Sequence, residues 1–250
     1  MPDKAIHLSI VVPVRNGADQ LSDNLRAIME FLCRQPYAAE VVLVDDGSRP
    51  RTAELLQDFV RSAPAFTLLR NSENHGKGYS VARGMLAARG QYRVFTDADL
   101  AYPIEEVRTI LRALEAGSDL AVACRVLPES RYLISPSFFH YLYSRHLMSR
   151  AFNLLVRVTL IPGILDTQAG LKGFTARAAE LVFPRLTIPG FGFDVELLYV
   201  ARKYGLSITQ TPVAFRYDSE PSTVRFVRDA VTMFGDLVKI RWNDLWGRYR

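Results

Sequence analysis

Two pairs of carboxylates follow short runs with a strand pattern, at points where strands would end. Asp45 and Asp46 come directly after VVLV and before Gly47, while Asp97 and Asp99 come directly after RVFT and flank one alanine. Carboxylate oxygens placed in this way suit Mg²⁺ or Mn²⁺, which proteins often hold beside a diphosphate. Acids that follow strands also cap the next helix, so a structural role remains open for each pair alone. If both pairs lie on one rim of a sheet, a metal and phosphate site is favoured.

A glycine-rich loop offers a second place where an anion could bind. Residues 71–78 read NSENHGKG, with Lys77 between two glycines at the start of a helical pattern. Backbone N–H groups at a helix N-terminus attract phosphate. The spacing differs from the G-x-x-x-x-G-K-[ST] phosphate-binding motif. The loop therefore indicates a phosphate or ribose contact only in combination with the carboxylates.

Alternating strand and helix patterns must position these groups. In the first half, strands are expected at 8–14, 40–46, 66–70, 92–99 and 119–125, with amphipathic helices at 19–34, 51–62, 77–89 and 104–116. In the second half, strands are expected at 171–175 and 207–215, with helices near 176–183 and 194–204. Such alternation predicts an α/β fold whose mostly parallel sheet carries helices on both faces. Ligands of such sheets bind at the carboxyl ends of the strands, where both acid pairs would lie.

The segment 130–165 has an unusual charge pattern. It contains four arginines and no Asp or Glu, and aromatic and aliphatic residues fill much of the space between the arginines. Arginine binds phosphate, and the apolar residues suit the headgroup boundary of a membrane. A solvated helix face is the alternative for any single arginine. From about residue 222, apolar residues at spacings of three and four predict a C-terminal amphipathic helix, which either packs on the domain or lies on a membrane.

Composition narrows the classes of protein. The 250 residues are 49% hydrophobic and 23% charged, with a net charge of +5, which is typical of a globular protein that favours anionic partners. Two cysteines cannot form a disulfide framework and suit a reducing compartment. We see no run of about 18 apolar residues and no signal-peptide pattern. We expect no nucleic-acid partner, because no binding motif is present.

Six blocks occur in an order that resembles a known family. They are IVVPVRN (10–16), VDDGS (44–48), NSENHGKGYSVARGM (71–85), TDADL (96–100), DTQAGLKGF (166–174) and FDVELLY (193–199). Together they resemble the family 2 glycosyltransferases, and within them the enzymes that transfer glucose or mannose to dolichyl and other polyprenyl phosphates. The resemblance implies a GT-A fold with a Rossmann-like sheet, a nucleotide-sugar donor, and Mg²⁺ or Mn²⁺. It also implies a glycosyltransferase domain over 1–217, with nucleotide binding in about 1–125 and acceptor binding in about 126–217, followed by a helical appendage over 218–250.

The resemblance assigns roles to residues at matching positions. Donor binding is implied for Pro13, Val14, Asn16, Asp45, Asp46, Ser48, Gly76, Lys77, Asp97 and Ala98. Asp97 and Asp99 form the D-x-D element that would hold the metal, with Asp99 as the more direct ligand. Acceptor binding is implied for Arg125, Arg145, Ser149, Arg157 and Lys172. The candidate catalytic residues are Asp97, Asp99 and Asp194.

An acceptor phosphate removes the need for a strong general base. It is already anionic at neutral pH and can attack the anomeric carbon once it is aligned and the leaving group is stabilised, which inverts the sugar configuration. We therefore assign no firm base. Asp194 matches the base of relatives with hydroxyl acceptors. Here it would orient sugar hydroxyls instead, or serve only as an acid at a helix N-terminus.

Two details decide the expected donor. Mannosyl-transferring relatives typically carry Gln where this chain has Ala101, and FDVELLY is closer to the glucosyl type. We expect metal-dependent transfer of a hexose to polyprenyl phosphate, with UDP-glucose favoured over GDP-mannose, by a cytoplasmic protein that is peripheral at the inner face of a membrane. Two alternatives stay open: a saccharide or other hydroxyl acceptor with the same donor chemistry, and a non-catalytic nucleotide-binding scaffold.

Overall fold

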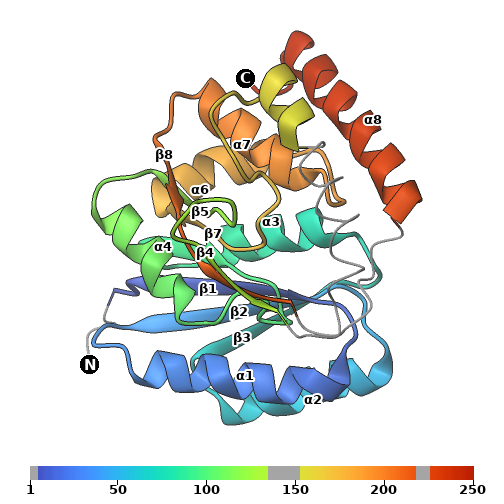
Figure 1. Ribbon diagram of the computed structural model, residues 1–250. Helices are drawn as coiled ribbons and strands as arrows, with labels where there is room; N and C mark the ends of the chain where they lie inside the picture. The colour runs from blue at the N-terminus through green and yellow to red at the C-terminus, as the bar shows by residue number, and fades with distance from the viewer. Residues whose placement is uncertain (1–4, 135–152, 218–225) are drawn as a thin grey trace.

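A seven-stranded sheet forms the centre of the protein in the computed structural model, which describes residues 5–134, 153–217 and 226–250 (Figure 1). Its strand order is β3-β2-β1-β4-β7-β5-β8. The strands are β1 (Leu8–Val14), β2 (Ala39–Asp45), β3 (Phe66–Arg70), β4 (Tyr92–Phe95), β5 (Leu120–Ala123), β7 (Lys172–Thr175) and β8 (Ile208–Thr211). Only β7 runs antiparallel to its neighbours within this sheet. The predicted α/β fold with a mostly parallel sheet is confirmed.

Helices cover both faces of the sheet, because successive side chains of a strand point to opposite faces. One hydrophobic layer contains α1 (Ala18–Cys33), α2 (Pro50–Ser62) and α4 (Glu106–Glu115). The other contains α3 (Lys77–Ala87), α6 (Ala176–Val182), the 3₁₀ helix η2 (Phe183–Arg185), α7 (Phe193–Lys203) and α8 (Phe226–Leu245). In β1, Val11 joins the second layer, whereas Ile10 and Val12 join the first. Among the described helices, none has the length and apolar character needed to cross a bilayer.

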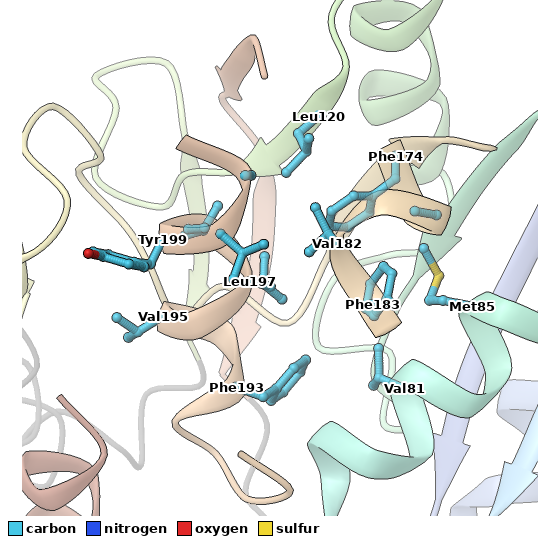
Figure 2. Close-up of a cluster of buried hydrophobic side chains, with 14 of the residues drawn as sticks. Val81, Met85, Leu120, Phe174, Val182, Phe183, Phe193, Val195, Leu197 and Tyr199 are labelled. Carbon is cyan, nitrogen blue, oxygen red and sulfur yellow. The ribbon is translucent and has the colours of Figure 1, made fainter. Parts of the chain in front are cut away.

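Aromatic and aliphatic side chains pack together in the layer that contains α3, α6 and α7 (Figure 2). Phe174 of β7 and Phe183 of η2 meet edge to face with ring centroids 5.0 Å apart. Phe95 of β4 lies 5.9 Å from Phe193 of α7, centroid to centroid. Such aromatic pairs add stabilisation beyond the area they bury. Because Phe95 ends β4 and Phe193 begins α7, this packing fixes the turn after β4 relative to the start of α7.

The two longest predicted strands are shorter than expected. The run 92–99 forms a strand only as far as Phe95, and its acids lie in a turn in which Leu100 has a φ of 49°. The run 207–215 is interrupted after β8 by Pro212, which has no N–H for the ladder. The chain then continues as β9 (Ala214–Tyr217), which pairs in parallel with β6 (Arg131–Ile134). This two-stranded sheet was not predicted.

The antiparallel direction of β7 brings a loop that is distant in sequence to the rim of the sheet where both acid pairs lie. Lys172, the first residue of β7, is the register partner of Phe95, the last residue of β4. Val14 and Asp45, which end β1 and β2, are partners in the same way. Loop 166–171, which leads into β7, therefore arrives at the rim where β1, β2 and β4 end.

Candidate functional site

Asp46 holds the glycine-rich loop. Its Oδ1 accepts hydrogen bonds from His75 N (2.9 Å) and Asn71 Nδ2 (2.8 Å), and its Oδ2 accepts one from Gly76 N (2.9 Å). Gly76 has a φ of +99°, and a Cβ there would overlap a neighbouring carbonyl, so a larger residue would be strained. Asp46 thus anchors the loop to the end of β2 and places Lys77 at the start of α3.

Asp45 is fully buried, and its two carboxylate oxygens have different surroundings. Oδ1 accepts a hydrogen bond from Ser48 N (2.9 Å), and Ser48 Oγ accepts one from Asn16 N (2.9 Å). Within the described residues Oδ2 makes no hydrogen bond, and it lies 3.4 Å from Arg70 Nε. This contact with Arg70 is an ion pair, which offsets part of the cost of burying the oxygen, and a hydrogen-bond donor from a ligand would satisfy the oxygen further. Asp45 Oδ2 therefore suits an N–H or O–H group of a bound base or ribose.

The D-x-D acids lie in the turn that follows β4. Asp99 is exposed, and its Oδ1 accepts a hydrogen bond from the backbone N of Ala101 (3.0 Å). Between the two acids, Ala98 O accepts a hydrogen bond from Asn24 Nδ2 of α1 (2.8 Å). The turn is therefore fixed to α1, and it presents Asp99 at the rim beside Asp97.

Lys77 places a positive charge beside the D-x-D turn. Its Nζ lies 2.6 Å from Asp97 Oδ1. Burial lowers the pKa of Lys77, but Asp97, Asp194 and Asp99 together raise the pKa by more, so it lies above its ordinary value. The ammonium group consequently stays charged at neutral pH. Together with the N-terminus of α3, it provides positive charge for a phosphate group at this rim.

Lys172 lies buried beneath the D-x-D turn. Its ammonium group pairs with Asp194 of α7, donates to Ala169 O (2.6 Å) and lies 5.6 Å from the ring centroid of Phe95. Lys172 is 0% exposed and Asp194 is 4% exposed. Burial lowers the pKa of Lys172 and raises that of Asp194, as expected when two opposite charges leave water together. The predicted acceptor contact of Lys172 would require the acceptor to displace Asp194 or Ala169.

Gly170 lets loop 166–171 lie against Asp97. A Cβ at position 170 would overlap Asp97 Oδ2. The other oxygen of Asp97 is paired with Lys77. Asp97 is therefore held on both sides, by an ammonium group and by the backbone of loop 166–171.

Replacing Gly170 by alanine is expected to move the Asp97 carboxylate and to lower metal-dependent turnover about a hundredfold, because small misplacements of reacting groups have effects of that size. The measurement is hydrolysis of UDP-glucose as a function of Mg²⁺ concentration. Gly235→Ala is the matched control, since a Cβ at position 235 meets nothing within 4 Å. Equal Mg²⁺ dependence in both variants would show that the contact does not position Asp97.

Arg125, which follows β5, is engaged by loop 166–171. Its Nε and Nη2 donate to the two carboxylate oxygens of Asp166 at 2.7 and 2.9 Å, and its backbone N donates at 3.1 Å. Burial raises the pKa of Asp166, but Arg125 outweighs burial and holds that pKa below its usual value. Asn153 Oδ1 accepts from Thr167 N (3.1 Å) and Thr167 Oγ1 (2.7 Å). Arg125 thus positions this loop, and its predicted contact with an acceptor stays a prediction.

The remaining predicted residues fall into two groups. Pro13 and Val14 end β1 at the rim beside the donor-side residues described above. Arg157 lies partly exposed on a helical segment over 153–159, while Arg145 and Ser149 lie outside the described residues. Among the described residues, those with a predicted donor role therefore gather at the rim where β1, β2 and β4 end.

Three residues with site contacts had no role in the sequence analysis. Gly170 and Asp166 lie within DTQAGLKGF, and Asn71 lies within NSENHGKG, so their blocks were noted but their partners were not. Asn71 Nδ2 donates to Ser80 Oγ (3.0 Å) as well as to Asp46. A role in positioning requires a partner, and these partners are distant in sequence.

The D-x-D turn suits a divalent ion whose other ligands come from a bound diphosphate. Asp97 and Asp99 offer carboxylate oxygens, which Mg²⁺ and Mn²⁺ prefer. Throughout the described parts of the chain, no group of three His, Cys, Asp or Glu side chains could hold a metal. Mg²⁺ is commonly bound by one or two carboxylates together with phosphate oxygens and water. The residues present therefore suit an ion that binds together with a nucleotide.

Comparison with known proteins gives consistent results. The model of the family described as glycosyl transferase family 2 matches residues 9–170. A dolichyl-phosphate beta-glucosyltransferase of Dictyostelium discoideum is 31% identical over 262 residues, covering 100% of this chain and 78% of the relative. The enzyme of the same name from Saccharomyces cerevisiae is 30% identical and covers 99% and 78%, and that from Homo sapiens is 30% identical and covers 97% and 77%.

Solved structures of similar shape include those of two enzymes. Mannosyl-3-phosphoglycerate synthase from Rubrobacter xylanophilus has a TM-score of 0.68 at 20% identity, covering 97% of this chain and 75% of that one. Glucosyl-3-phosphoglycerate synthase from Mycobacterium tuberculosis, in complex with UDP, has a TM-score of 0.67 at 18% identity, covering 94% and 80%. Another structure of the second enzyme contains Mg²⁺ and UDP. At these identities the likeness establishes the GT-A fold.

Proposed function

The chain belongs to glycosyl transferase family 2, and on that premise we propose that it transfers glucose from UDP-glucose to dolichyl phosphate or a related polyprenyl phosphate. The three relatives above are named as glucosyltransferases that use dolichyl phosphate, which supports both the sugar and the acceptor. Structures of similar shape with UDP support the nucleotide. The proposal places about 1–125 on the donor side and about 126–217 on the acceptor side.

The observation that carries the proposal is the convergence of donor-side groups on one rim. Asp45 Oδ2 provides a buried acceptor without a hydrogen-bond donor, and Lys77 provides a cation beside Asp97. Asp46 fixes the loop between them. A base or ribose at Asp45 would thus direct its diphosphate toward Lys77 and the D-x-D turn.

Leaving-group stabilisation is the main chemical task of these residues. When a divalent ion is bound by Asp97 and Asp99, it neutralises charge that develops on the departing UDP. Lys77 and the N-terminus of α3 add fixed positive charge, and fixed charge needs little reorganisation during reaction. The acceptor phosphate attacks the anomeric carbon from the opposite side, which inverts its configuration.

The surroundings of Asp194 favour a phosphate acceptor over a hydroxyl acceptor. A hydroxyl acceptor needs a general base within hydrogen-bond reach. Asp194 is buried and paired with Lys172, so the residue that matches the base of hydroxyl-using relatives is engaged elsewhere. An acceptor phosphate is already ionised and needs no such base. The enzyme is then expected to act at the cytoplasmic face of a membrane, where it can meet a lipid phosphate.

The direct test uses UDP-glucose labelled in the sugar, dolichyl phosphate in detergent, and Mg²⁺ or Mn²⁺. We expect label to enter the organic extract as an acid-labile lipid, and we expect GDP-mannose to be a poorer donor. Dolichol without its phosphate is the matched control acceptor. Label that enters a soluble saccharide and never the lipid would replace this proposal with the hydroxyl-acceptor alternative, and binding of UDP without any turnover would indicate a scaffold.

A further inference from the structure

Helix α8 packs one of its faces against the body of the protein. Leu237 and Ile240 are buried in the same cluster as α7. Asp244 pairs with Lys203 and accepts a hydrogen bond from Tyr199 OH (2.6 Å). The predicted packing role of the C-terminal helix is therefore correct for this face.

The opposite face of α8 is also apolar, and it is exposed. Phe234 is 56% exposed, Val238 62%, Trp242 59%, Leu245 81% and Trp246 71%. Steps of three and four residues place these side chains on one face of a helix, which we call the outer face. Figure 1 shows α8 along the outer side of α7, where this face has no covering element among the described residues. Large exposed apolar patches commonly mark sites of contact with proteins or membranes.

A neighbouring helical segment, 153–159, extends the apolar character of this side. Leu154 is 58% exposed and Val158 is 77% exposed. The segment is joined to α8 because Arg241 donates a hydrogen bond to Thr159 O. Helix α8 and the segment 153–159 thus present aliphatic and aromatic side chains beside each other.

Basic residues lie on the exposed side of α8, whereas its described acids face the protein. Lys239, Arg241 and Arg248 are exposed on or just beyond α8. The acids of α8 with described side chains face inward, since Asp244 is paired with Lys203 and Asp236 lies against Gly192. Burial also raises the pKa of Asp236, as expected for a carboxyl group that faces the protein interior. The exposed side is consequently basic as well as apolar.

We propose that the outer face of α8 docks in the plane of an anionic bilayer surface. Its aromatic and aliphatic side chains would enter the headgroup boundary, while the basic residues contact anionic lipid headgroups. This deepens the proposed function, on which it rests, because an enzyme that glucosylates a lipid phosphate must reach a membrane. A second copy of the chain would bring the same cations together, whereas an anionic bilayer complements them.

The fluorescence of the two tryptophans reports directly on membrane docking. The chain contains two tryptophans, Trp242 and Trp246, and both lie on the outer face. Addition of phosphatidylcholine vesicles that contain phosphatidylserine should shift tryptophan emission to the blue, and brominated lipid should quench it. Phosphatidylcholine vesicles alone should bind more weakly, and high salt should weaken binding to the anionic ones.

Substitutions separate docking from folding and from catalysis. The double variant Val238→Asp/Leu245→Asp should bind anionic vesicles at least about thirtyfold more weakly, since it loses two apolar side chains and adds two negative charges. The matched control is Leu86→Asp on α3, which is 45% exposed and should bind as the unaltered protein does. The double variant should still hydrolyse UDP-glucose in the absence of lipid, which shows that it is folded.

The outcomes distinguish this inference from the proposed function. Asp99→Asn should bind vesicles normally even though its glucose transfer is about a thousandfold slower. Transfer to detergent-solubilised dolichyl phosphate without any vesicle binding would overturn the docking face and leave the function standing. Vesicle binding without any glucose transfer would support the docking face and overturn the proposed function. A blue shift that grows with protein concentration in the absence of lipid would show that a second copy covers the face, and would overturn the inference.

Discussion

Replacing Asp99 by asparagine is expected to lower kcat for glucose transfer about a thousandfold, while the protein remains folded. The side chain is exposed in the turn after β4, and Asn can still accept the hydrogen bond from Ala101 N. What the variant loses is a negatively charged ligand for a divalent ion at the leaving diphosphate. Removal of one group that stabilises transition-state charge commonly costs a factor of a hundred to a thousand, and loss of an ion adds to that cost.

The measurement is labelled glucose transferred per minute at saturating Mg²⁺, with thermal unfolding to verify the fold. Asp19→Asn serves as the matched control, because Asp19 is an exposed acid that pairs with Arg51 on the surface (2.6 Å). Chelation of the metal should reduce the unaltered enzyme to about the rate of the Asp99 variant. If Asp99→Asn keeps its full Mg²⁺-dependent rate, the D-x-D turn is not the metal site.

Replacing Lys172 by methionine is expected to destabilise the protein by about 3–5 kcal/mol, the usual cost of leaving one partner of a buried ion pair. Lys172 is 0% exposed and pairs with Asp194, which is 4% exposed. Without the ammonium group, Asp194 can remain buried only if it is neutral. The second substitution Asp194→Asn removes that charge, so the double variant should recover part of the lost stability.

The pH dependence of this variant has a definite sign. Burial already raises the pKa of Asp194 in the folded state, and loss of Lys172 removes an opposing influence. A carboxyl group whose folded pKa is raised binds its proton more tightly when folded, so its contribution is present below the unfolded value of about 3.9 and is lost as pH rises through the folded pKa. The stability deficit of Lys172→Met should therefore be smallest in acid and grow toward neutral pH. Urea unfolding across this range measures it, and a deficit independent of pH would refute the assignment.

The location of the donor site could be predicted from local sequence. Both acid pairs, Asp45 with Asp46 and Asp97 with Asp99, follow a run with a strand pattern, and in a parallel sheet the carboxyl ends of strands share one edge. That reasoning needs only the strand pattern and the direction of the strands. The structure confirms the strands and places both acid pairs on the predicted rim.

The division of labour between adjacent acids could not be predicted in this way. Asp45 and Asp46 are neighbours, yet Asp46 anchors residues 75 and 76, whereas Asp45 keeps a buried oxygen without a donor. The choice depends on which loop packs against β2, and that loop belongs to another part of the chain. The contacts of these two acids depend on residues that are distant in sequence, so residue type alone does not reveal them.

The role of Lys172 was harder still to predict. It depends on β7 running antiparallel between β4 and β5, which places its first residue at the rim and buries it against Asp194. The resemblance implied an acceptor contact for this lysine, which stays a prediction, and a short strand pattern does not reveal the strand direction that buries the lysine. The sequence also gave no indication that α8 would be apolar on two opposite faces, because the same spacing describes a helix packed on one side.

The central claim is that Asp45, Lys77, Asp97 and Asp99 form one site for a nucleotide diphosphate and a metal. Diffraction at the manganese absorption edge, from crystals grown with UDP and Mn²⁺, tests it most directly. We predict one anomalous peak at about 2–2.4 Å from an Asp99 carboxylate oxygen, with phosphate oxygens of UDP as further ligands and the base or ribose within hydrogen-bond distance of Asp45 Oδ2. A manganese ion bound away from the D-x-D turn, or UDP on another surface, would contradict the claim.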